Sequence, residues 1–196
     1  MRAAAFLSRT IRQTTLISCT VLCTALIPAA AMHAQSSEAS AAAKLRDEYM
    51  ADMDSTHLKI IAIAAAIPES RYGWRPAPAV RSVSEVLMHL TGEWYYYCPL
   101  SVAAKPPTDF GVPREHLAAL EKLSTKAEVT AQLEQSWTYC RAALAAADPA
   151  QLTGRYKPWN ATLSQAAFGM TGDQHEHLGQ LIAYARSVGV TPPWSK

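Results

Sequence analysis

Residues 162–189 read TLSQAAFGMTGDQHEHLGQLIAYARSVG and carry the start, body and end signals of one long helix. Thr162 can accept a hydrogen bond from the backbone amide of Gln165, and the Gln165 side chain can reach back to the amide of Thr162, which makes a capping box. Apolar residues then recur at steps of three and four, as on one face of a helix. The pattern runs to about Val188, and Gly189 suits the left-handed position that follows many helices.

Three upstream segments show the same periodicity, over about residues 40–67, 82–97 and 125–148. Two of them begin with further capping boxes, at Ser82 and at Thr125. A proline closes each segment, because proline has no amide hydrogen and clashes with the preceding turn. No segment has a convincing strand pattern, so the expected fold is all-α.

The connection between the second and third helices is long, from Cys98 to about Ser124, and holds four prolines. A short helix is expected within it, at about residues 114–122. A link of this length can carry the chain across a bundle, whereas a tight turn would place the two helices antiparallel. We therefore expect a four-helix bundle with a long crossover connection between helices 2 and 3, and loops at about residues 69–81 and 152–160.

Residues 1–34 have the features of a secretory signal peptide. Three arginines and no acidic residue come before an apolar run that ends at Ala31. Small residues up to Ala34 then offer a cleavage site. The predicted domains are a signal peptide over residues 1–34 and one helical domain over residues 35–196, exported to the periplasm or the extracellular space. An uncleaved membrane anchor is the alternative, although the apolar run is short for a bilayer core of about 30 Å.

The composition of the predicted domain limits its partners. The signal segment holds three of the 18 basic residues and none of the 16 acidic ones, so 15 basic residues remain against 16 acidic ones. Without a basic patch we expect no nucleic-acid partner. Cys98 and Cys140 also remain. They could form a disulfide in an oxidising compartment or stay as two separate buried thiols, and the sequence leaves both alternatives open.

Polar residues of the fourth helix have the spacing of metal ligands. Asp173 and His177 lie four residues apart, and positions four apart share one face of a helix. A carboxylate and an imidazole at this spacing make half of a site for Zn²⁺, Ni²⁺, Fe²⁺ or Mn²⁺. His175 points about 200° away from Asp173 and is expected on a flank of the helix. A third ligand must come from another helix, and His89 on the buried stripe of the second helix is the best candidate.

Other residues near His89 have weaker claims to a role. Glu85 and Glu93 flank His89 by one turn each and could orient its ring as hydrogen-bond acceptors. His57, on the inward stripe of the first helix, is a second candidate for the third ligand. Taken by spacing alone, each of these histidines could equally be an ordinary core or surface residue.

Several motifs join these residues to a known family. Residues 81–90, RSVSEVLMHL, contain His89 near their end, and residues 72–76, YGWRP, precede them. Residues 177–181, HLGQL, follow the pattern H-x-G-Q, and the chain then continues with YAR and a late glycine and proline pair. Together with the long second connection, these motifs resemble those of the DinB-like superfamily of four-helix proteins. The resemblance covers about residues 45–195.

The resemblance implies a metal site and locates its ligands. Members of this family commonly bind a divalent metal through one histidine in helix 2 and two histidines four residues apart in helix 4. Carried over, the first is His89 and the third is His177, while the second family position falls on Asp173. A carboxylate can replace an imidazole, and two histidines with one carboxylate leave open positions for water or substrate. The resemblance therefore implies a divalent metal, Zn, Ni, Fe or Mn, bound by His89, Asp173 and His177.

The same resemblance leaves two classes of function open. Some relatives are thiol transferases, in which the metal activates the thiol of a small cofactor such as bacillithiol or mycothiol, and metal-dependent hydrolysis is the other enzymatic option. We therefore expect a metal-dependent transferase or hydrolase that acts on an unknown small molecule, with no catalytic residue assigned. The alternative is a non-enzymatic metal-binding or stress-related helical module with a degenerate site.

Aromatic residues gather close to His89 in the sequence. Five of them could line a ligand pocket, although core packing explains them as well: Trp74, Trp94, Tyr95, Tyr96 and Tyr97. The three consecutive tyrosines cannot all face inward on one helix, so part of this run should be exposed or should meet a partner. A homodimer contact is the partner that we expect.

Overall fold

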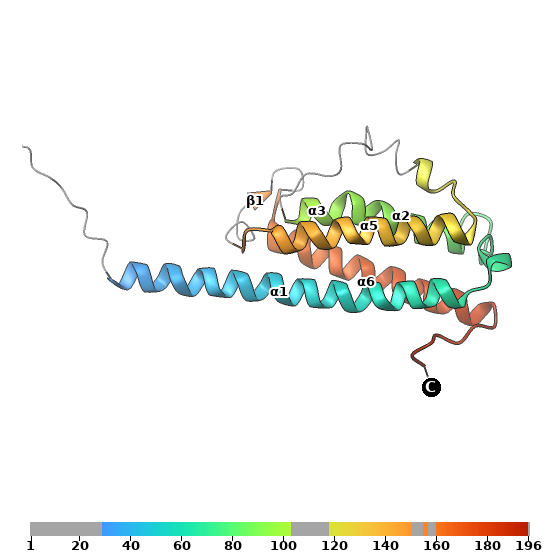
Figure 1. Ribbon diagram of the computed structural model, residues 1–196, viewed down its shortest axis with the longest axis horizontal. Helices are drawn as coiled ribbons and strands as arrows, with labels where there is room; N and C mark the ends of the chain where they lie inside the picture. Colours follow the sequence, from blue (N-terminus) through green and yellow to red (C-terminus); the bar gives the residue numbers. More distant parts are fainter. Residues whose placement is uncertain (1–28, 103–117, 150–154, 157–159, 196) are drawn as a thin grey trace, which may run out of the picture.

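The computed structural model describes residues 29–102, 118–149, 155–156 and 160–195. Four long helices form a bundle, as expected (Figure 1). Their bounds are Ala29–Ala66 for α1, Val83–Tyr95 for α2, Lys126–Ala146 for α5 and Leu163–Ser187 for α6. The all-α fold predicted from the periodicity is therefore confirmed, with a first helix that begins earlier than expected and extends beyond the bundle at its N-terminal end.

The helix starts follow the predicted caps, with one difference. Ser82 and Thr162 both form complete capping boxes, in which the side chain of the residue three positions later accepts from the cap amide. Thr125 also accepts from the amide of Glu128, but its hydroxyl donates to the Glu128 carboxylate at 2.6 Å, so this box is not closed through the backbone. At the other end, Gly189 has a φ of 82°, the left-handed backbone that glycine adopts without strain.

The chain direction explains the long second connection. α2 packs between α5 and α6, and α1 completes the bundle by packing against the same two helices. Figure 1 shows that α2 and α5 run in the same direction, so the chain must return along the length of the bundle between them. This confirms the predicted crossover. Residues 103–117 lie outside the described residues, and residues 118–120 at the end of the expected short helix are helical.

Four short elements were not predicted. α2 ends at Tyr95, and a separate short helix, α3 at Tyr97–Ser101, contains Pro99. Proline is tolerated there because the first amides of a helix have no partner within the helix. Two-residue strands, β1 at Arg155–Tyr156 and β2 at Ala161–Thr162, pair antiparallel, so the expectation of no strand was wrong at this point. The 3₁₀ helix η1 covers Glu69–Arg71 in the first loop.

The bundle interior is mainly apolar and is filled from all four long helices. The largest fully buried side chains are Trp94, Tyr72, Met53, Ile60, Ile63, Ile67, Leu87, Met88, Leu90, Leu133 and Leu144. Of the three consecutive tyrosines, Tyr95 is buried, while Tyr96 and Tyr97 are partly exposed and contact each other. The run is therefore divided between core and surface as expected, and the homodimer stays a prediction.

A disulfide joins Cys98 of α3 to Cys140 of α5. It settles the alternative that the sequence left open, since the two cysteines lie in neighbouring elements and are both fully buried. The bond closes a segment with a sequence separation of 42 residues, which includes the crossover connection. It therefore ties the far end of the α2–α3 segment to the helix that follows the connection.

The predicted signal peptide falls mostly outside the described residues. Residues 1–28 are not described, and α1 already begins at Ala29, ahead of the predicted cleavage site after residue 34. Cleavage and export therefore stay predictions. Within the part of the chain that the structure describes, no helix is both long and apolar enough to cross a membrane.

Candidate metal centre

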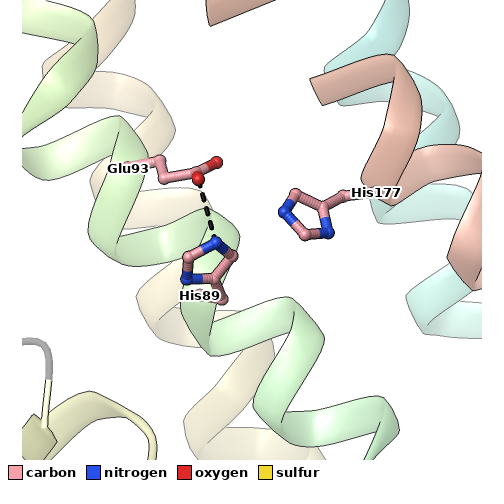
Figure 2. A group of neighbouring side chains, drawn as sticks. All are labelled: His89, Glu93 and His177. Carbon is pink, nitrogen blue, oxygen red and sulfur yellow. Dashed lines mark ion pairs between the residues drawn. The ribbon is translucent and has the colours of Figure 1, made fainter. Parts of the chain in front are cut away.

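Three side chains converge between α2 and α6. His89 and Glu93 lie four residues apart on α2 and so share one face of the helix. With His177 of α6, each offers one donor atom, and the three donor atoms lie within 4.8 Å of one another. Figure 2 shows the His177 ring reaching from α6 toward the His89 ring and the Glu93 carboxylate. Within the part of the chain that the structure describes, this is the group of histidine, cysteine and carboxylate side chains whose donor atoms lie close enough together to hold one metal ion.

The distances within the group suit a single cation. His89 Nε2 and Glu93 Oε1 are 3.0 Å apart, and the two imidazole rings meet edge to face with their centroids 4.8 Å apart. Two ligands of one zinc-sized ion lie at most about 4.2 Å apart, since each metal–ligand distance is about 2.1 Å. The three donors therefore need to shift by less than about 1 Å to share an ion.

A chain of hydrogen bonds fixes the orientation of His177. Its Nδ1 lies 3.0 Å from Oε1 of Gln180, which can only accept, so Nδ1 carries the proton. Gln180 Nε2 donates to the hydroxyl of Tyr184, which donates in turn to the backbone carbonyl of Arg81. Nε2 of His177 is thereby left as a lone-pair donor that faces the centre. This arrangement gives the H-x-G-Q motif a physical role, because its glutamine sets the tautomer of its histidine.

A second chain of hydrogen bonds holds Glu93. The indole of Trp94 donates to Gln174 Oε1, and Gln174 Nε2 donates to Glu93 Oε2, both at 2.7 Å. All three side chains are buried. One carboxylate oxygen of Glu93 is therefore occupied by the amide of Gln174, and the other is directed at His89.

The electrostatics of the group favour a cation. Burial, together with the Asp173 carboxylate beside it, raises the pKa of Glu93 to about 9. Burial also lowers the pKa of His89, and the positive charge of Arg81 lowers it further. A buried carboxyl next to a second carboxyl needs a proton or a cation to be stable, and neutral imidazoles are the form that binds metals. The donor set of two imidazoles and one carboxylate thus fits a divalent transition metal.

The structure brings His89 and His177 together, as the sequence-based hypothesis requires. Asp173 lies beside them, with Oδ1 3.7 Å from His177 Nε2 and with Oδ2 buried and without a hydrogen-bond partner. Its carboxylate is not one of the three donors that lie within 4.8 Å of one another. Glu93 is the carboxylate within that group, and metal binding by Asp173 stays a prediction.

The other two histidines considered from the sequence lie elsewhere. His57 is buried in the core, where its ring stacks on Trp137 at 4.4 Å, and it is not part of the metal group. His175 lies on the flank of α6, as expected, with Nε2 3.0 Å from the carboxylate of Asp52 on α1. Neither histidine therefore competes for the centre.

Glu93 is the site residue whose role sequence reasoning gave only in part. It was expected to orient the ring of His89, and its Oε1 does lie 3.0 Å from His89 Nε2. Its carboxylate is also buried within the candidate donor group, which the sequence reasoning did not propose. The signal was present, because Glu93 follows His89 by four residues, the same spacing that singled out Asp173 and His177. What the spacing could not give is the rotation of α2, which turns both residues toward α6.

Comparison with known proteins agrees with the fold and the site. A family model described as the DinB superfamily matches residues 53–181. The chain belongs to the DinB superfamily. The DinB match begins in α1 and ends in α6, so it includes all three donors and the crossover connection. No curated protein matches the chain.

Proposed function

We propose that this DinB-superfamily protein is exported and holds one divalent metal at His89, Glu93 and His177 for transferase or hydrolase chemistry on a small molecule. The observation that carries the proposal is the buried carboxyl of Glu93, which faces two imidazoles across the α2–α6 interface. A structural role alone does not account for it, since an apolar residue at this position would avoid the cost of burying a carboxyl beside Asp173.

A divalent metal at this centre would supply Lewis acidity and lower the pKa of a water or thiol that binds it. The residues of the chain prepare the place for it. Gln180 keeps Nε2 of His177 free of its proton, and Gln174 holds Glu93 so that one oxygen faces the centre. Asp173 adds a buried oxygen without a partner, which can accept a hydrogen bond from a substrate group.

Two features support export. The predicted signal peptide gives the route, and the Cys98–Cys140 disulfide is of the kind that persists in oxidising compartments and is rare in the cytosol. Export also narrows the chemistry, because the small-molecule thiols used by some relatives are chiefly cytoplasmic. Hydrolysis, or transfer from another donor, is therefore favoured over transfer from such a thiol.

The proposal is tested by loading purified protein with Zn²⁺, Ni²⁺, Fe²⁺ or Mn²⁺ in turn and assaying it on two panels. One panel contains activated esters and amides, and the other pairs a small thiol with an electrophilic acceptor. We expect turnover on one panel that needs the metal and disappears in His177→Ala. Stoichiometric metal with no turnover on either panel would favour a non-enzymatic metal-binding module, and no metal in the wild type would overturn the proposal.

A further inference from the structure

Two rows of side chains face each other beside the metal centre, and the centre occupies only one end of them. α2 and α6 run in opposite directions, so residues spaced by four on each helix form antiparallel rows. The first row runs from α2 into α3 and consists of His89, Glu93 and Tyr97. The second row lies on α6 and consists of His177, Asp173 and Gly169. The metal donors lie at the end that holds the two histidines.

A cavity of about 320 Å³ lies at the other end of the rows. Glu93 lines the cavity and is also one of the three donors of the metal centre. Asp173 lines the cavity too and lies beside the centre. The rest of its wall is mostly apolar or small, and consists of Tyr97, Ala161, Gln165, Ala166, Gly169 and Met170. The cavity is therefore an open, largely apolar pocket with one polar end, a common form of small-molecule site.

The polar end selects the head group of a ligand. Both oxygens of Glu93 already face partners, His89 and Gln174. Asp173 Oδ2 is buried and has no partner, so it requires a hydrogen-bond donor. No basic side chain is among the described residues of the wall, and the two charges of a bound divalent metal would already be balanced by the carboxylates of Glu93 and Asp173, so an anionic ligand would add an unbalanced negative charge.

The volume limits the size of the ligand. Small-molecule sites commonly have volumes of about 300–1,000 Å³, so this cavity lies at the small end of that range. That space suits one aromatic ring or a short branched alkyl group with its head group.

We propose that this cavity binds the aromatic or branched alkyl body of a small uncharged molecule whose hydroxyl or thiol group donates to Asp173 beside the metal centre. The inference deepens the proposed function and rests on it, because it names the class of substrate that the centre would act upon. It adds a determinant of specificity, the small residues Ala166 and Gly169, whose small size leaves the pocket free.

Glycines of α6 provide a matched test. A Cβ added at Gly169 or at Gly172 meets nothing within 4 Å, so either position accepts a larger residue, but only Gly169 lines the cavity. Gly169→Leu and Ala166→Leu fill the pocket from two neighbouring positions. Gly172→Leu is the control, because it adds the same side chain to α6 outside the pocket. Binding of benzyl alcohol to the zinc-loaded protein is followed by shifts in amide NMR spectra, with benzoate as the anionic counterpart and with zinc content measured on every sample.

We expect saturable binding of benzyl alcohol with a dissociation constant on the order of 1 mM, as for a small fragment. Both cavity-filling variants should weaken it by at least about tenfold because they occupy the space, while Gly172→Leu leaves it unchanged and benzoate does not bind. Absence of saturable binding, equal binding in the filled variants, or equal binding of benzoate overturns the inference. Bound zinc without bound benzyl alcohol overturns the pocket alone, whereas benzyl alcohol bound without zinc overturns the proposed function alone.

Discussion

Replacing Glu93 with glutamine should stabilise the metal-free protein and remove its metal affinity. The raised pKa of Glu93, about 9 against a usual 4.5, gives the size of the first effect. The folded state keeps this group protonated at pH 7, which is about 2.5 units above its usual pKa, and each unit costs about 1.4 kcal/mol. The side chain is only 7% exposed, so solvent screens little of this cost. Glu93→Gln should therefore gain about 3 kcal/mol at pH 7.

The sign of this effect varies with pH. Because the folded pKa lies above the unfolded one, the penalty is absent below about pH 4.5 and grows as the pH rises toward 9. The difference in free energy of unfolding between Glu93→Gln and the wild type, measured by urea denaturation with a chelator present, should accordingly be near zero at pH 4.5 and largest near pH 9.

Metal affinity should change in the opposite sense. A glutamine cannot supply the negative donor, and the loss should exceed the roughly 10- to 100-fold cost of removing a residue that only orients a ligand. Competition with a chromophoric chelator measures it. A variant that is more stable without metal and unable to bind it would show that the carboxylate is retained for function rather than for folding.

Glu85 offers the matched control, one turn from His89 on the other side. Burial is the largest single influence on the pKa of Glu85 and raises it, but the hydrogen bond from the amide of Ser82 and the pairing with Arg75 together bring this pKa below its usual value. Glu85→Gln should therefore destabilise the protein modestly and leave its metal affinity unchanged. The reasoning fails if Glu93→Gln is less stable than the wild type in the absence of metal, or if both variants bind metal like the wild type.

Three further predictions follow from other contacts. Gln180→Leu removes the acceptor for Nδ1 of His177, so the affinity for zinc should fall by about 10- to 100-fold in the same chelator assay. Replacing Cys98 and Cys140 by serine opens a loop with a sequence separation of 42 residues and should lower the free energy of unfolding by about 4 kcal/mol; an unchanged urea midpoint would contradict this. Burial lowers the pKa of His57 to about 4, so its contribution to stability is complete above pH 6.5 and is lost as the pH falls. His57→Phe keeps a ring against Trp137, so between pH 7 and pH 4.5 its free energy of unfolding should fall by up to about 3 kcal/mol less than that of the wild type. An equal fall in both proteins would contradict the lowered pKa of His57.

The helices were predictable because their signals are local. The caps at Ser82 and Thr162 and the glycine at Gly189 act within a few residues, and each is found where the sequence placed it. The break after Tyr95 was not predictable, because the tolerance of a short helix for Pro99 depends on which amides happen to lie in its first turn. The two-residue strands likewise depend on pairing rather than on any pattern of their own.

The site was predictable only in part, for a reason of geometry. Spacing shows which residues of one helix share a face, and it correctly paired Asp173 with His177 and excluded His175. It does not fix how two helices are rotated against each other, and that rotation decides that Glu93 rather than Asp173 completes the group of three donors. The cavity beyond the centre depends on the same rotation, since its walls come from both rows.

The central claim is that one divalent cation binds at His89, Glu93 and His177. Anomalous diffraction from crystals grown with Zn²⁺ tests it directly. We predict one strong peak within about 2.3 Å of a nitrogen of each histidine and of an oxygen of Glu93. A peak at the exposed pair of His175 and Asp52 alone, or no peak between α2 and α6, would contradict the claim.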